Sequence, residues 1–181
     1  MISLAIALCT FAALSLVNHS EGLRLNLRWL LGVTIIATLT LGGTGIVTTA
    51  WSVALVAVLL AITITDLKTQ LLPDWLTGLL IILGLAQAGF AFPSLLGAII
   101  CILCALANAT ITKDEGMIGS ADYLLCAGLV AWLGPLHAMD ALIIALVLFG
   151  LQLILTGRRL AAFAPATSIG LSAIWFGGPF L

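Results

Sequence analysis

The sequence predicts an all-α protein, a bundle of about eight transmembrane helices with both termini outside the cytoplasm. Charged residues make up 7% of the chain, six Lys or Arg and seven Asp or Glu, whereas a soluble domain carries about 25%. Hydrophobic residues make up 63%, and the mean hydropathy is +1.32. This composition excludes a soluble enzyme, a disordered tail and a nucleic-acid-binding protein, and it predicts one integral-membrane domain over residues 1–181 within the lipid bilayer.

The helices are expected where uncharged stretches approach the roughly 20 apolar residues that a membrane span needs. The first stretch, Met1–Val17, lacks the positively charged start of a secretory signal and is expected to remain as a helix. Residues 29–65 carry no charge and are too many for one span, so two spans are expected, with a turn at Gly42-Gly43-Thr44-Gly45. The other spans are expected at residues 75–92, 94–111, 122–136, 138–155 and 160–180.

The basic residues predict the orientation of these helices. All of them follow an odd-numbered predicted helix, and none follows an even-numbered one; they are Arg24, Arg28, Lys68, Lys113, Arg158 and Arg159. Cytoplasmic loops are enriched in Lys and Arg, so these loops are expected to be cytoplasmic.

The tryptophans lie near the predicted helix ends, as in the aromatic belts of membrane proteins. Trp29 and Trp75 fall near cytoplasmic ends, whereas Trp51, Trp132 and Trp175 fall nearer the outer ends.

The cysteines indicate no metal site. Cys9, Cys101, Cys104 and Cys126 all lie within apolar runs, and the one close pair has no second pair or His cluster to complete a tetrahedral site. We expect packing residues, no disulfide framework, no metal and no cofactor.

Asp66 is the acid with the least evident structural role. It closes the apolar run 54–65, at a helix carboxyl end where the helix dipole disfavours a carboxylate. Asp74, in contrast, follows Pro73 at the expected start of a helix, where proline and negative charge are both favoured.

Asp122 is the second candidate, because the apolar run of the next helix follows it directly. Capping of that helix is the simpler alternative. The remaining acids have simpler interpretations as well: solvated loops for Glu21, Asp114 and Glu115, and the membrane interface for Asp140.

Asp66 and Asp122 are separated by one outward and one inward crossing, so both are expected at the cytoplasmic boundary at similar depth. Two neighbouring carboxyl groups share one proton, so that one can activate water while the other protonates a leaving group. The pair therefore predicts the chemistry of an aspartic protease.

The motifs resemble those of the type IV prepilin peptidases, the aspartic intramembrane peptidases of the GxGD class. The resemblance covers residues 55–174 and rests on Asp66 with Leu72-Pro73-Asp74, on Gly119-Ser120-Ala121-Asp122, and on Phe163-Ala164-Pro165 before the last helix.

The resemblance implies that Asp66 and Asp122 are the catalytic pair, and that Gly116, Gly119, Pro73 and Asp74 shape the loops that admit an extended substrate. It also implies the substrate, a type IV prepilin or pseudopilin precursor. The cut would lie on the cytoplasmic side of a bacterial inner membrane, between a short basic leader and the hydrophobic segment.

The chain departs from the family pattern at several points. Ala121 replaces the second glycine of Gly-x-Gly-Asp, and the lysine often found after the aspartate is absent, with Leu124 and Leu125 in its region. The predicted loop 18–28 is too short for the cysteine-rich domain of long members, so the short form, without methyl transfer, is expected.

Dipoles of the predicted helices suggest that Asp122 is the base and Asp66 the acid. Two other functions remain open at this point: a small proton- or cation-coupled transporter, and a scaffold subunit without chemistry. The sequence has no internal repeat and no acid predicted at mid-membrane depth, and both absences count against a transporter.

Overall fold

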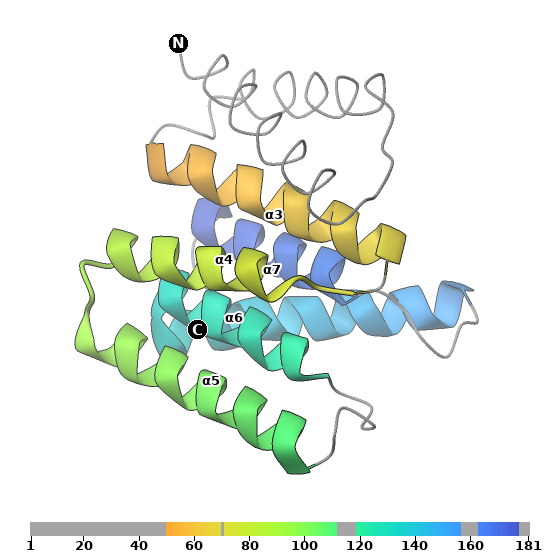
Figure 1. Cartoon of the computed structure of the whole chain (residues 1–181). Helices are drawn as coiled ribbons and strands as arrows, with labels where there is room; N and C mark the ends of the chain where they lie inside the picture. The colour runs from red at the N-terminus through yellow and green to blue at the C-terminus, as the bar shows by residue number, and fades with distance from the viewer. Residues whose placement is uncertain (1–49, 70, 112–118, 157–162, 178–181) are drawn as a thin grey trace.

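The computed structural model describes residues 50–69, 71–111, 119–156 and 163–177, and in these segments every regular element is a helix (Figure 1). The five helices are α3 (Ala50–Thr69), α4 (Asp74–Gln87), α5 (Phe92–Ile111), α6 (Ser120–Thr156) and α7 (Ala164–Gly177). The all-α prediction is therefore confirmed for the described part of the chain. The helices expected before residue 50, and the location of both termini, lie outside it.

Three of these helices are long and apolar enough to cross a membrane: Ala50–Thr69, Phe92–Ile111 and Ser120–Leu155. The helix Asp74–Gln87 is equally apolar in character but shorter. Large apolar side chains of α5 are exposed along its length, among them Leu96, Ile99, Ile100, Leu103 and Leu106. An apolar surface of this kind suits contact with lipid rather than water.

The helix predicted at 75–92 ends earlier than expected, at Gln87. Gly89 and Phe90 have positive φ, and their N–H groups donate to the carbonyls of Ala86 and Leu85. This is a Schellman motif, which satisfies the last carbonyls of a helix and ends it. The apolar residues 88–91 therefore form the turn into α5.

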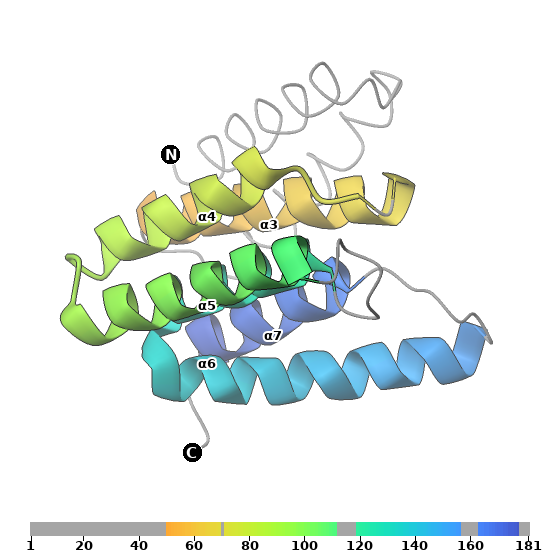
Figure 2. The same ribbon diagram turned by 60° about the horizontal axis from the view of Figure 1, so that its bottom comes forward.

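The helices predicted at 122–136 and 138–155 are halves of α6, which is interrupted at Gly134 with φ 76° and ψ 166°. Glycine adopts this backbone conformation without steric cost, and Pro135 follows as the first residue of the second half. The chain reverses there, so that the second half of α6 runs back along the bundle (Figure 2).

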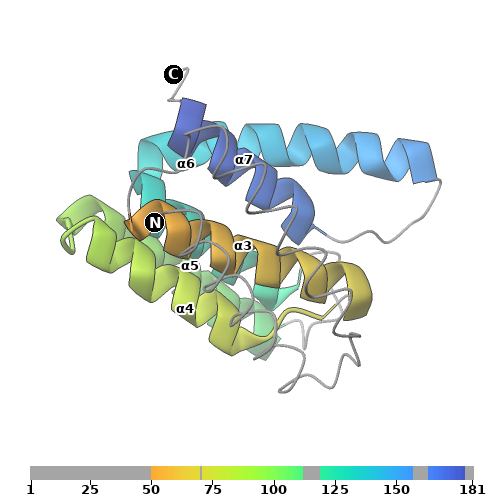
Figure 3. The same cartoon turned by 90° about the horizontal axis from the view of Figure 1, so that it is seen from above.

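The first half of α6 packs against α4 and α5, and α7 packs against both α6 and α3 (Figure 3). The main core cluster joins four helices, with Leu55 and Ile62 from α3, Leu80 from α4, Leu129 from α6 and Leu171 from α7.

Close approach between helices depends on small residues. A side chain at Gly170 would collide with the backbone carbonyl of Ala141, so α7 and the second half of α6 are in backbone contact there.

Trp132 is not part of an aromatic belt, because its side chain is only 3% exposed. Its indole N–H donates to the carbonyl oxygen of Leu80 at 2.9 Å, and its ring meets Trp175 edge to face at 5.3 Å between centroids. The residue packs α6 against α4 and α7, so the expectation that it marks the outer interface is wrong.

Candidate active site

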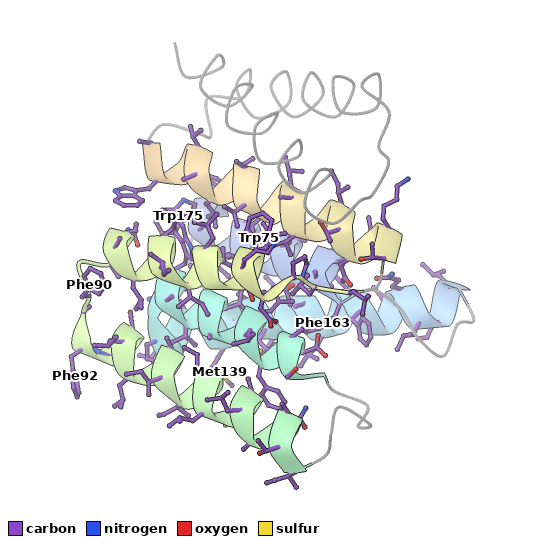
Figure 4. The ribbon with its side chains drawn as sticks, viewed as in Figure 1. Trp75, Phe90, Phe92, Met139, Phe163 and Trp175 are labelled. Carbon is purple, nitrogen blue, oxygen red and sulfur yellow. The ribbon has the colours of Figure 1, made fainter. Side chains whose placement is uncertain are left out.

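One end of the bundle gathers the carboxyl ends of α3 and α5 and the amino ends of α4, α6 and α7 (Figures 1 and 2). Phe163, labelled in Figure 4, lies at this end, whereas Phe90 and Phe92 lie at the opposite one. Asp66 is in the last turn of α3 and Asp122 in the first turn of α6. Both candidate acids are therefore carried to the same end of the bundle.

Asp66 has a partner that the sequence did not reveal. Its side chain is 8% exposed, and its Oδ2 accepts a hydrogen bond of 2.8 Å from the backbone N–H of Ala164, the first residue of α7. The backbone of Phe163, the residue before α7, lies near the same carboxyl group. Asp66 thus lies at the carboxyl end of its own helix but at the amino end of another.

Asp122 is half-buried and is held by its own loop. Its Oδ2 accepts a hydrogen bond of 3.1 Å from the N–H of Gly119, while its N–H donates to the carbonyl of Gly119 at 3.1 Å. This reciprocal pair organises the start of α6 in the manner of a cap. The capping interpretation of Asp122 therefore describes part of its role.

The carboxyl groups of Asp66 and Asp122 are close enough to interact electrostatically. Neighbouring carboxylates cannot both be charged cheaply, because their repulsion in a half-buried site is strong. A state with one charged and one protonated acid is therefore favoured over two charged acids, and such a state can supply both a base and an acid for the hydrolysis of an amide bond.

Pro73 and Asp74 form the start of α4. Pro73 is the N-cap residue with φ −65°, and its carbonyl accepts from the N–H groups of Leu76 and Thr77. Asp74 is exposed in the first turn. These contacts give both residues a clear structural role; a role in shaping the substrate entry stays a prediction.

The departure at Ala121 has a simple structural account. Ala121 lies within α6, and the one described non-glycine residue with positive φ is Phe90. A helical backbone accepts alanine better than glycine, so this position does not require the missing glycine. Gly119 likewise has no positive φ, and Gly116, with Asp114 and Glu115, lies outside the described residues.

The prediction that Asp140 reaches the membrane interface is wrong, because its side chain is 0% exposed. Both of its oxygens lack a hydrogen-bond partner, and its nearest ionisable neighbour is His137, with Nδ1 at 4.0 Å from Oδ2. Asp140 lies about 9 Å along the helix axis from the break at Gly134. It is buried because the adjacent face of α6 packs against α7 through Ala141.

The cysteines of the described segments are free thiols: Cys101, Cys104 and Cys126. Cys126 lies one turn after Asp122 in α6. In the part of the chain that the structure describes, no three His, Cys, Asp or Glu side chains are grouped so that they could hold a metal ion.

Residues 53–155 match the model of the type IV leader peptidase family. A curated relative, the prepilin leader peptidase/N-methyltransferase of Neisseria gonorrhoeae, is 37% identical over 129 residues, covering 64% of this chain and 44% of that protein. The chain therefore spans less than half the length of the relative. No solved structure matches the chain. The matched family segment contains both Asp66 and Asp122.

Proposed function

Because the chain belongs to the type IV leader peptidase family, we propose that it is an aspartic endopeptidase acting on type IV prepilin-like precursors. It would remove the short basic leader at the cytoplasmic face of the membrane. The observation that carries this proposal is the electrostatic pairing of Asp66 with Asp122 at one end of an apolar bundle.

The two acids come from helices far apart in the chain, α3 and α6, and meet where both helices have an end. One carboxylate would take a proton from water as the water attacks the scissile carbonyl carbon. The other carboxyl group would donate a proton to the carbonyl oxygen, and the proton taken from water would then pass to the amine so that it can leave. This division of labour needs one proton on the pair, and it supports hydrolysis without a bound cofactor.

The substrate class and the side of the membrane rest on two further supports. The gonococcal relative is named for prepilin leader cleavage, and the basic residues of this sequence all follow odd-numbered predicted helices. Asp66 and Asp122 together are called the dyad below. A scissile bond beside the hydrophobic segment of a pilin precursor would reach the dyad at the lipid boundary. We propose that this boundary is the cytoplasmic face of a bacterial inner membrane.

The test is co-expression of the chain with an epitope-tagged type IV prepilin, with leader removal followed as a mobility shift on a gel. Asp66→Asn and Asp122→Asn are expected to abolish cleavage, because an amide can neither accept nor donate the required proton. Asp114→Asn, near Asp122 in sequence, and Asp140→Asn, a buried acid at the other end of the bundle, are the controls and are expected to cleave.

Cleavage by both Asp66→Asn and Asp122→Asn would show that the catalytic assignment is wrong. If Asp122→Asn cleaves and Asp114→Asn does not, the second acid has been misassigned. A wild-type chain that leaves the prepilin intact would refute the proposed substrate class.

A further inference from the structure

The amino end of α7 is built around a backbone donor that points at Asp66. Phe163 precedes the helix, and its carbonyl accepts the N–H of Thr167 at 3.1 Å. Ala164 is therefore the first helical residue, and its N–H has no partner within α7. Pro165 follows and has no N–H at all. The N–H of Ala164 donates to Asp66 Oδ2, from a residue 98 positions away.

A helix usually satisfies its first N–H groups with a Ser, Thr, Asp or Asn that precedes it. Phe163 cannot do this, and Asp66 of α3 takes that place. The contact is dry, since Ala164 is 1% exposed, and a hydrogen bond from N–H to a charged carboxylate is roughly twice as strong as one between neutral groups.

The position of this donor is fixed by the packing of α7. Thr63 donates to Ser168 at 2.9 Å, which ties α7 to α3 one turn from the dyad. Gly170 brings α7 into backbone contact with Ala141 of α6. The ring of Phe163 meets that of Phe149 edge to face, with centroids 5.3 Å apart. The N–H of Ala164 is thus held on two sides.

The two acids of the dyad differ in this respect. Asp66 is the more deeply buried, which by itself disfavours its charged form. The N–H of Ala164 counteracts that cost, because it donates to Asp66 from a helix amino end, where the partial positive charge favours an anion. Asp122 accepts a longer bond, of 3.1 Å, from Gly119 in its own entry loop. We propose that the amino end of α7 is a positioning element of the active site, which keeps Asp66 as the charged, water-activating carboxylate and leaves the proton on Asp122.

This proposal rests on the proposed function and reverses the roles that the dipoles of α3 and α6 alone suggest. Asp66 takes a proton from water while the water oxygen bonds to the scissile carbon, and the proton of Asp122 moves to the carbonyl oxygen. In the second step Asp66 gives its proton to the amide nitrogen, a hydroxyl of the intermediate returns a proton to Asp122, and the C–N bond breaks. Both acids end as they began.

Among the described residues near this end of the bundle, the titratable groups other than Asp66 are Asp122, Tyr123 and Cys126 of α6, Asp74 of α4 and Lys68 of α3. Asp122 is the group that interacts with Asp66 electrostatically. Asp74 of α4 and Lys68 of α3 are exposed, and residues 164–177 of α7 contain no titratable side chain. The pH profile of cleavage is therefore expected to report on the dyad and its backbone donors.

The test is Ala164→Pro, which removes the N–H at a helix position where proline is otherwise favoured. Phe92→Pro is the matched control, because Phe92 is also the first residue of its helix, also precedes a proline, and lies at the opposite end of the bundle. Ala164→Val adds a similar bulk but keeps the N–H. Cleavage of a detergent-solubilised type IV prepilin is measured across pH for each full-length variant.

In Ala164→Pro the acid limb of the pH profile is expected to move to higher pH by about one unit, with about tenfold slower cleavage on that limb. The reason is that the base then loses a donor that favours its charged form. Phe92→Pro and Ala164→Val are expected to keep the wild-type limb. If Ala164→Pro unfolds, the same measurement is made with Ala164 replaced by lactic acid, which exchanges only the N–H for an ester oxygen.

An unmoved acid limb in an active Ala164→Pro variant overturns the assignment. A shift of the alkaline limb instead also overturns it, since that limb would move if Asp66 were the acid. A wild-type chain that does not cleave refutes the proposed function itself, whereas a cleaving wild type with either of these outcomes refutes only the role of α7.

Discussion

Thr63 of α3 donates a hydrogen bond of 2.9 Å to Ser168 of α7, one turn away from the carboxyl group that the two helices hold between them. The contact joins side chains 105 positions apart and is partly buried. Because α3 and α7 run antiparallel, Ser52 and Trp175 meet in the same interface farther along, at 3.2 Å. The polar contacts thus set the register in which α7 presents its amino end to Asp66.

Thr63→Val is expected to lower the free energy of unfolding by about 1 kcal/mol, because Ser168 is left without its donor in a partly buried site. Thermal unfolding in detergent measures the loss. In the double variant with Ser168→Ala the two losses are expected to be less than additive. Full additivity would mean that the two hydroxyls do not depend on each other.

Gly170→Ala is expected to destabilise the protein by about 2 kcal/mol or more, because the new methyl group meets the backbone carbonyl of Ala141, which cannot rotate away. Gly150→Ala is the matched control in α6, since a Cβ at Gly150 has no neighbour within 4 Å. That variant is expected to be as stable as the wild type or more so. Equal stability of both variants would argue against the close contact of α7 and α6.

Asp140→Leu is expected to raise the unfolding temperature and to leave prepilin cleavage unchanged. Both carboxyl oxygens of Asp140 are buried without partners, and an unpaired buried polar group costs about 1 to 3 kcal/mol. His137→Ala, which removes the neighbouring imidazole, is expected to leave cleavage unchanged as well. Loss of cleavage in Asp140→Leu with a higher unfolding temperature would assign Asp140 a part in the function.

Ala121→Gly, which restores the glycine of the family pattern, is expected to change the cleavage rate less than about twofold. The residue is helical in α6, so the substitution brings no conformational gain and costs about 1 kcal/mol of helix stability. Cleavage rate and unfolding temperature together check this. A large increase in cleavage rate would indicate that residue 121 needs a backbone conformation closed to alanine.

The sequence predicted α5 closely, at 94–111, because Pro93 marks its start and Lys113 follows its end. The helix corresponding to α3 was expected from the division of residues 29–65 at the glycine turn, and it continues past residue 65 to Thr69. The sequence placed the end of α4 too late, since Ala88 and Phe90 are apolar and a Schellman turn is recognised by backbone conformation. The break in α6 was expected close to its true place. Gly134-Pro135 was the available signal for the exact position.

The pairing of Asp66 with Asp122 was also predictable, because two crossings bring the chain back to one side. The partner of Asp66 was not, since a backbone N–H has no signature in the sequence. Asp140 was misplaced for a related reason: its burial depends on how closely α7 approaches α6, and that follows from Gly170, some 30 residues away in the chain.

The hydrogen bond from Ala164 to Asp66 has a consequence for how this site tolerates change. Every amino acid except proline carries the same N–H, so random substitution at position 164 leaves the donor intact in nearly all cases. A contact made by the backbone in this way is retained after most substitutions, whereas a contact made by a side chain is lost when that side chain is replaced. For the same reason, a comparison of amino-acid identities at position 164 does not reveal the hydrogen bond to Asp66.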